Sequence, residues 1–336
     1  MPKTESDLRR AFSEDGELKT HVGGQALLEG IMMRGKFNWS VAVRQPDGEI
    51  YLEEHDLASG RPENSWLRWP IIRGVVAFVE SLMLGYKALE IAALHAFDDE
   101  EAEGEAEGDE ESVEFGHKEM VVSMVIGLVL GVVLFVVAPA VVTNLIVGEY
   151  DHATLAWNLV DGLLRVAVFV FYIWLIGRMG DIKRMFGYHG AEHKTIHCFE
   201  HGLPLTPENA RSFPRLHVRC GTAFLIMVMI IAIIVYTITP LNALISTWGV
   251  PDGVPKLALV IVVRILLMPL IAGISYEITV KWAGSHPENP LVKVILWPGM
   301  QMQYLTTREP DDSQIECAIA AMQLVLEREQ REAESC

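Results

Sequence analysis

The chain has 336 residues, of which 51% are hydrophobic, and its mean hydropathy of +0.27 exceeds what a soluble globular chain usually shows. Asp and Glu number 44 against 27 Lys and Arg, so the net charge is −17, and we expect no nucleic-acid partner. Residues 1–20 are polar and charged, so we expect no cleavable signal peptide and a disordered N-terminal tail.

Residues 21–60 are expected to form a small cytoplasmic β unit. The runs SVAVR and EIYLEE flank Pro46-Asp47-Gly48, and such a turn between two strand-like runs predicts a β-hairpin. Glycines lie on both sides of Gln25, Glu29 and Arg34. This segment would either dock the β unit on the rest of the chain or form a loop that binds an anion or substrate.

A helical segment follows at 66–97. It carries Arg73, Glu80, Lys87 and Glu90, which favours an amphipathic helix on the inner leaflet over a further membrane span. A re-entrant or packed helix is the alternative. Residues 98–116 then form an acidic, disordered linker, because 98–114 hold eleven carboxylates and no Lys or Arg. A cation-buffering or partner-binding role is its alternative.

Residues 117–282 are predicted to be a membrane domain of four transmembrane helices. The first-to-second and third-to-fourth connections carry no Lys or Arg, whereas the second-to-third, a His-rich loop at 177–220, carries seven. The positive-inside rule therefore places this loop and both termini in the cytoplasm. The predicted spans are Met120–Val147, Leu155–Ile176, Gly221–Ile245 and Pro255–Glu277.

Three charges fall inside these spans. Asp161 and Arg165 are one helical turn apart, and Arg264 lies at similar depth in the fourth span. Charges in the bilayer core are costly unless they are paired, so we predict a contact between Asp161 and Arg264 that clamps two helices. A polar translocation pathway is the functional alternative.

Four histidines follow the second span at a spacing of four, at 189, 193, 197 and 201. Within them, His189-Gly-Ala-Glu192-His193 matches the inverted zinc motif H-x-x-E-H. On a helix, two imidazoles at i and i+4 can bind one cation, and the glutamate can accept a proton from the bound water. The alternative is a partly exposed helix face without a metal.

Several residues are candidates to complete this site. His197, His217 and Glu277 are the candidates for the third metal ligand, and Cys220, next to Arg219, is a further candidate. The metal is expected to be zinc, with iron as the alternative. Cys198 points away from the histidine face and is expected to pack in the core.

Residues 283–336 are expected to be a cytoplasmic segment that contains a helix from about Ser313 to Arg331. Thr306–Asp312 precedes it, and would cap the helix or contribute to a polar site.

Six stretches of the chain are similar to the YqhQ-like family of bacterial membrane proteins, an uncharacterised family regarded as metal-dependent enzymes because of its histidines. The resemblance covers roughly residues 21–326. Val218 stands where the family usually has Pro, which should not affect metal coordination. The acidic linker at 98–116 is peculiar to this chain. The stretches are GGQALLEGIMMRG, WPIIRGV, YHGAEHKTIHCFE, RCGTAF, AGISYE and LTTREPDDSQIE.

Together these features predict a mainly α, polytopic protein of the bacterial plasma membrane with a small cytoplasmic β unit and amphipathic helices. The expected function is a cytoplasm-facing, metal-dependent enzyme, a zinc hydrolase with Glu192 as general base, acting on a substrate at the membrane interface. A membrane-anchored scaffold with a structural or regulatory metal is the main alternative, and a transporter or a non-haem iron oxidase is less favoured. The expected partners are the lipid bilayer and an unidentified substrate or protein at the membrane interface. An oligomer is also compatible with the sequence.

Overall fold

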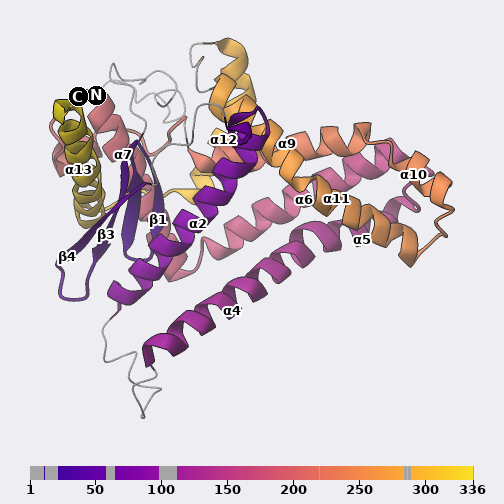
Figure 1. Cartoon of the computed structure of the whole chain (residues 1–336), viewed down its shortest axis with the longest axis horizontal. Helices are drawn as coiled ribbons and strands as arrows, with labels where there is room; N and C mark the ends of the chain where they lie inside the picture. Colours follow the sequence, from indigo (N-terminus) through magenta and orange to yellow (C-terminus); the bar gives the residue numbers. More distant parts are fainter. Residues whose placement is uncertain are drawn as a thin grey trace.

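A computed structural model of the chain describes residues 11, 22–57, 65–97, 112–218, 220–283, 286 and 289–335. Most of the expected N-terminal tail, residues 98–111 of the expected acidic linker, and Arg219 lie outside these residues. Figure 1 shows two connected parts, a cap that contains the β-sheet and a set of long helices that run away from it.

The cap is built on a four-stranded antiparallel sheet with the strand order β1-β2-β3-β4. The hairpin predicted around Pro46-Asp47-Gly48 is confirmed, since β3 pairs with β4 from Arg44 opposite Ile50 to Asn38 opposite Asp56. Gly48 has a φ of +91° in the connecting turn, a conformation that glycine adopts without strain. The strands are β1 (Gly23–Leu27), β2 (Gly30–Arg34), β3 (Asn38–Arg44) and β4 (Ile50–Asp56).

Helices cover both faces of this sheet. Met32, Val41 and Val43 pack against Ala88 and Ala92 of α2 (Ile72–His95). The alternate residues of the same strands pack against α7 (Gly180–Glu200) and α13 (Asp312–Ser335). Burial on both faces explains why the runs IMM and VAV are continuously apolar rather than alternating.

Helix α2 lies between the sheet and the long helices. It packs closely on α11 (Val254–Tyr276), because a Cβ on Gly74 would lie 2.7 Å from the Cβ of Tyr276. Its other side keeps Val79, Leu82 and Met83 exposed. Helix α2 therefore packs on a neighbouring helix, as expected of a packed helix, and also has the exposed apolar face expected of an amphipathic helix on the inner leaflet.

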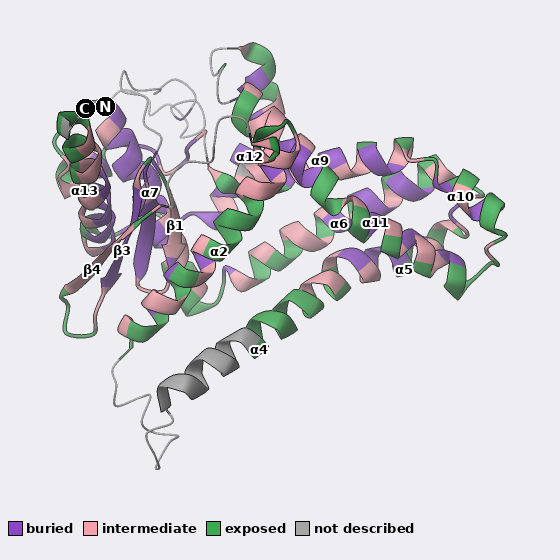
Figure 2. Ribbon diagram, viewed as in Figure 1, coloured by how far each residue is buried: buried purple, intermediate pink, exposed green. Residues whose placement is uncertain are grey.

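Three described helical segments are long and apolar enough to cross a membrane, and a bent pair would make a fourth if it is one span. The pair is Phe224–Ile238 and Leu241–Trp248, bent by 47° at Pro240, where the missing N–H interrupts the helix. At most 28% of each of the three apolar windows is buried, and Figure 2 shows exposed residues along these helices. This is compatible with a membrane protein. The three segments are Val122–Val147, Thr154–Ile176 and Val254–Ala283.

Two of these segments contain π-helical turns. The first runs from α4 (Ser112–Val132) through η3 (Val133–Val137) into α5 (Ala138–Val147). The third continues α11 through η4 (Glu277–Ala283). The remaining described helices are η1 (Trp66–Arg68), α6 (Thr154–Ile176), α8 (Pro207–Arg211), α9 (Gly221–Ile238), α10 (Leu241–Trp248) and α12 (Pro290–Thr306).

The predicted contact between Asp161 and Arg264 is confirmed. Asp161 pairs with Arg264 and also with Arg165, whose Nε lies 2.7 Å from the carboxylate. Arg165 further donates to the carbonyl oxygens of Phe135 and Val136 at 2.9 and 3.2 Å, both in the π-helical turn η3. These ion pairs and hydrogen bonds stabilise the three charges and connect α6 with α11 and with the first apolar segment.

The C-terminal part differs from the prediction in one helix. The helix expected from about Ser313 to Arg331 is present as α13, and Asp311 Oδ1 accepts the N–H of Gln314 at its start. Helix α12 was not predicted, because Pro298 and Gly299 lie in its middle and such residues usually mark a helix end.

Candidate metal centre

Helix α7 positions the histidine row. It is continuous from Gly180 to Glu200, so His189, His193 and His197 share one face at a spacing of four residues. His201 is the C-cap residue, and its Nδ1 lies 2.8 Å from the carbonyl oxygen of His197.

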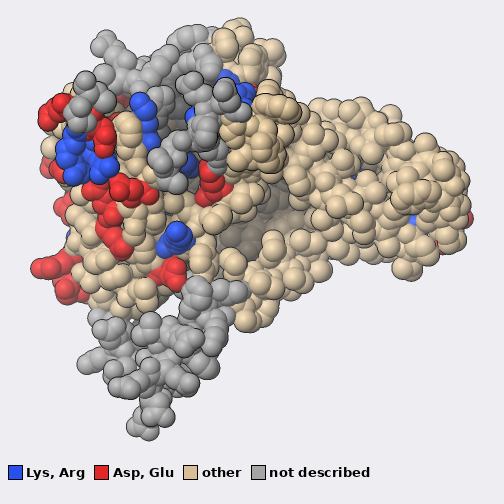
Figure 3. All heavy atoms as spheres, viewed as in Figure 1, with Lys and Arg blue, Asp and Glu red and all other residues tan. Residues whose placement is uncertain are grey.

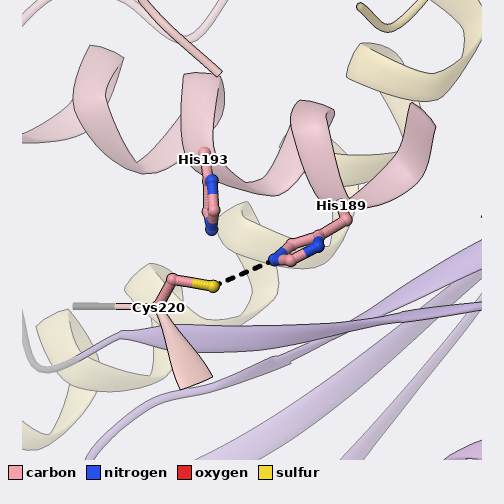
Figure 4. A group of neighbouring side chains, drawn as sticks. All are labelled: His189, His193 and Cys220. Atoms are coloured by element: carbon pink, nitrogen blue, oxygen red, sulfur yellow. Dashed lines mark hydrogen bonds between the residues drawn. The ribbon is translucent and has the colours of Figure 1, made fainter. Parts of the chain in front are cut away.

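Two of these histidines meet a cysteine from another element. His189, His193 and Cys220 each offer one ligand atom, and the three atoms lie within 4.8 Å of one another. Nε2 of His189 is 3.1 Å from Sγ of Cys220. Figure 4 shows both imidazoles descending from the same helix toward the sulfur atom, which comes from the start of α9. A cluster of this composition and size suits a transition-metal ion.

Backbone carbonyls fix the tautomers of both imidazoles. Nδ1 of His189 lies 2.8 Å from the Thr306 carbonyl oxygen, and Nδ1 of His193 lies 2.6 Å from that of Arg215. A carbonyl only accepts, so each Nδ1 carries a proton, and in the neutral imidazole this leaves the lone pair on Nε2. Burial lowers the pKa of His193 to about 4. Neutral imidazoles oriented through their second nitrogen are typical of metal ligands.

The thiol of Cys220 also lies in a setting that favours its ligand form. Cys220 is the N-cap residue of α9, where its sulfur accepts the N–H of Thr222 and lies 3.1 Å from the Thr222 hydroxyl. Burial by itself raises the pKa of this thiol, but hydrogen bonds from Thr222 stabilise the thiolate, and the pKa lies below its usual value. The thiolate is the form of cysteine that binds metals.

Glu192 lies beside this cluster. Its side chain is buried, and its Oε1 accepts the backbone N–H of Gly24 in strand β1 at 2.8 Å. Burial raises its pKa to about 7, against the lowering effects of His189 and of the Gly24 N–H. A Cβ at position 24 would lie 2.9 Å from the carboxyl carbon of Glu192, so glycine permits this close approach.

A cavity of about 610 Å³ ends at these residues. His189, Glu192, Cys220 and Thr222 form its polar end. The walls come from α2, α6, α7, α9 and α11 with its continuation η4, together with β1 and α12. The cluster is therefore accessible to a ligand of substantial size, within the usual range of roughly 300–1,000 Å³ for ligand pockets.

A second buried group lies farther along α7. His197, Glu200 and His217 have ligand atoms within 4.8 Å of one another, with Nε2 of His217 3.5 Å from the Glu200 carboxylate. The ring centroids of His193 and His217 are 5.6 Å apart, so the two groups adjoin. His197 and His217 therefore do not belong to the group of His189 and His193. The third candidate ligand of that group is Cys220.

Glu277 does not reach the histidines either. Its carboxylate pairs with Arg73 of α2, with Nε of Arg73 at 2.7 Å, and accepts the N–H of Ile71 at 3.1 Å. It belongs to neither group of candidate ligands within the described part of the chain. The expected ligand role of Glu277 is therefore not supported, and Arg219 lies outside the described residues.

Two segments with alternative roles predicted from the sequence serve to position the cluster. Glu29 pairs with Arg184 of α7, which docks the β unit on that helix. In the segment Thr306–Asp312, Thr306 orients His189, and Glu309 pairs with the buried Lys194 at 2.7 Å. The sequence did not reveal that the carbonyl groups of Thr306 and Arg215 and the N–H of Gly24 hold the site, because backbone groups carry no sequence signal.

Comparisons with known proteins identify relatives without a known function. The model of a family described as "Protein of unknown function (DUF1385)" matches residues 69–328. A protein of Bacillus subtilis (strain 168) described as "Uncharacterized protein YqhQ" is 32% identical over 311 residues, which are 91% of this chain and 92% of the relative. No solved structure matches the chain.

Proposed function

Because the chain belongs to DUF1385, a family of unknown function, we propose its function from the site itself: a membrane-embedded, metal-dependent hydrolase. His189, His193 and Cys220 bind the metal, and Glu192 is the general base. The observation that carries this proposal is the convergence of two imidazole nitrogens and one thiol, with each imidazole oriented by a carbonyl through Nδ1.

The ligand set favours zinc. Zinc accepts both nitrogen and sulfur ligands, and catalytic zinc sites keep three protein ligands and an open position. Two histidines and one cysteine fit this rule, and the adjoining cavity gives a reactant access to the open side. Iron is the alternative, which elemental analysis distinguishes.

Each residue has a distinct role in this proposal. A zinc ion held by the three ligands would lower the pKa of a coordinated water toward 7. Glu192 would accept a proton from the attacking water and deliver it to the leaving group, a task suited to a carboxylate with a pKa of about 7. Gly24 holds the carboxylate in place, and burial keeps bulk water from competing for it.

We further propose four spans, with both termini on the cytoplasmic side of a bacterial plasma membrane. Figure 3 shows that Lys, Arg, Asp and Glu gather on the cap, whereas the visible face of the long helices is almost uncharged. The turns at 148–153 and 249–253 contain no Lys or Arg, and Tyr150 and Ile245 share one core cluster at the far end of the helices. The positive-inside rule places the charged side in the cytoplasm.

Cobalt binding tests the assignment of Cys220. Because a thiolate bound to Co²⁺ gives an intense ligand-to-metal charge-transfer band, the full-length chain titrated with Co²⁺ is expected to show this band in its absorption spectrum. Cys220→Ala should abolish the band and weaken Co²⁺ affinity at least about tenfold.

Cys198→Ala is the matched control, since Cys198 is buried in the core and belongs to neither group of candidate ligands. It should leave the band unchanged. A band that survives Cys220→Ala, or that disappears in Cys198→Ala, would remove Cys220 from the ligand set.

A further inference from the structure

The cavity above the cluster is apolar along its walls and meets the apolar surface of the protein. Phe78 and Leu82 of α2 and Leu225 of α9 line it, and the same side chains are 38%, 59% and 42% exposed. Phe169 and Ile173, from the candidate span α6, line it as well. In the proposed topology, the cavity therefore opens toward the bilayer near its cytoplasmic side.

Among the described residues, the lining of the cavity offers no cationic side chain to an anion. Its described lining residues include no Lys or Arg. Proteins usually hold phosphate groups with Arg or Lys, so the site is poorly suited to an anionic lipid headgroup.

A peptide is also a poor fit for the walls. An extended peptide chain has an N–H and a C=O at nearly every residue, and each must find a partner when it leaves water. Gln25, Ser81, Thr222, Tyr276 and Thr306 are the few uncharged polar side chains among the described lining residues outside the candidate metal ligands. A hydrocarbon chain needs no such partners.

We infer that the substrate is an uncharged lipid with a long apolar chain and an ester or amide carbonyl. The chain occupies the cavity, and the carbonyl lies at the end formed by His189, Glu192 and Cys220. This inference rests on the proposed function. In the reaction, the oxygen of a water molecule bonds to the acyl carbon, the bond from this carbon to the leaving oxygen or nitrogen breaks, and the proton accepted by Glu192 goes to the leaving atom.

Photolabelling of the full-length chain in detergent tests this inference. The probe is a long-chain fatty acid methyl ester with a diazirine in its chain, and mass spectrometry of the digested protein locates the label. We expect label on cavity residues such as Phe78, Phe169 and Leu225, at least about fivefold above that on Leu128 and Leu130, which are exposed on α4. Excess unlabelled ester should suppress the label in the cavity and not that on α4.

Two variants of α2 provide a matched pair. Ala77 lines the cavity, and Val79 lies two residues away with 48% of its side chain exposed. Ala77→Trp should fill the cavity and reduce its label several-fold, whereas Val79→Trp should not. A probe of the same length with a phosphate in place of the methyl ester should label the cavity more weakly.

The same experiment on His189→Ala/His193→Ala separates this inference from the proposed function. Cavity labelling that persists in this variant, which lacks two of the three proposed metal ligands, supports the lipid site whatever the metal content of the wild type proves to be. Label that is no stronger in the cavity than on α4, or that excess ester does not suppress, overturns the lipid inference even if the protein binds zinc. Equal labelling by the ester and phosphate probes would overturn the preference for an uncharged lipid.

Discussion

Replacing Asp161 with Ala is expected to destabilise the protein by roughly 3–5 kcal/mol, because breaking a buried ion pair leaves an uncompensated charge. Asp161 is the one carboxylate that faces both Arg165 and Arg264 among the described residues, and all three are buried. Its removal would leave two positive charges together among apolar helices. Thermal unfolding in detergent should show a lower midpoint and a smaller yield of monodisperse protein.

Arg264→Met tests the same cluster by removing one of its two positive charges. It leaves Asp161 paired with Arg165, and the apolar side chain of Met can pack between the rings of Trp157 and Tyr236, each centred 4.5 Å from the present guanidinium group. We therefore expect a smaller loss than for Asp161→Ala. Equal stability of Asp161→Ala and wild type, or a greater loss in Arg264→Met, would contradict the account of this cluster as a charge-balanced clamp.

Replacing Glu192 with Gln is expected to reduce hydrolysis of a long-chain p-nitrophenyl ester by about 10²–10⁴-fold, the usual contribution of a general base. Gln has the size of Glu, and its amide oxygen can still accept the N–H of Gly24. It cannot accept the proton of a water molecule at neutral pH. The rate should therefore fall while the metal content and the thermal unfolding midpoint stay close to those of the wild type.

Glu208→Gln serves as its control, because Glu208 is exposed on α8 and does not line the cavity. This variant should retain the wild-type rate. If Glu192→Gln also retained it, Glu192 would be a structural anchor for the β unit through Gly24, and the scaffold alternative would gain support.

The sequence predicted those parts of the fold that depend on local patterns. Continuous apolar windows located the long helices, the Pro46-Asp47-Gly48 turn located the β3–β4 hairpin, and the cost of unpaired charge led to the contact between Asp161 and Arg264. Helix α12 was missed because Pro298 and Gly299 interrupt its pattern. The sheet between α2 and α7 could not be foreseen, since long-range packing decides which elements cover it.

The candidate site was predicted only in part. His189 and His193 follow from their spacing on one helix. His197, one of the candidates for the third ligand, belongs instead to the second group, because eight residues at a rise of about 1.5 Å separate it from His189 by about 12 Å along the axis. Glu277 was a plausible ligand from the sequence, but in the fold its carboxylate pairs with Arg73 of α2. Cys220 comes from another element, and no spacing rule links it to α7.

Metal content is the most direct test of the central claim. The full-length protein, purified in detergent without chelators, is expected to contain about one zinc per chain by elemental analysis, and His189→Ala/His193→Ala is expected to contain none. His201→Ala is the control, since it removes the next histidine of the row, which belongs to neither group, and it should keep the zinc. No stoichiometric metal in the wild type, or an unchanged content in the double variant, would contradict a metal centre at His189, His193 and Cys220.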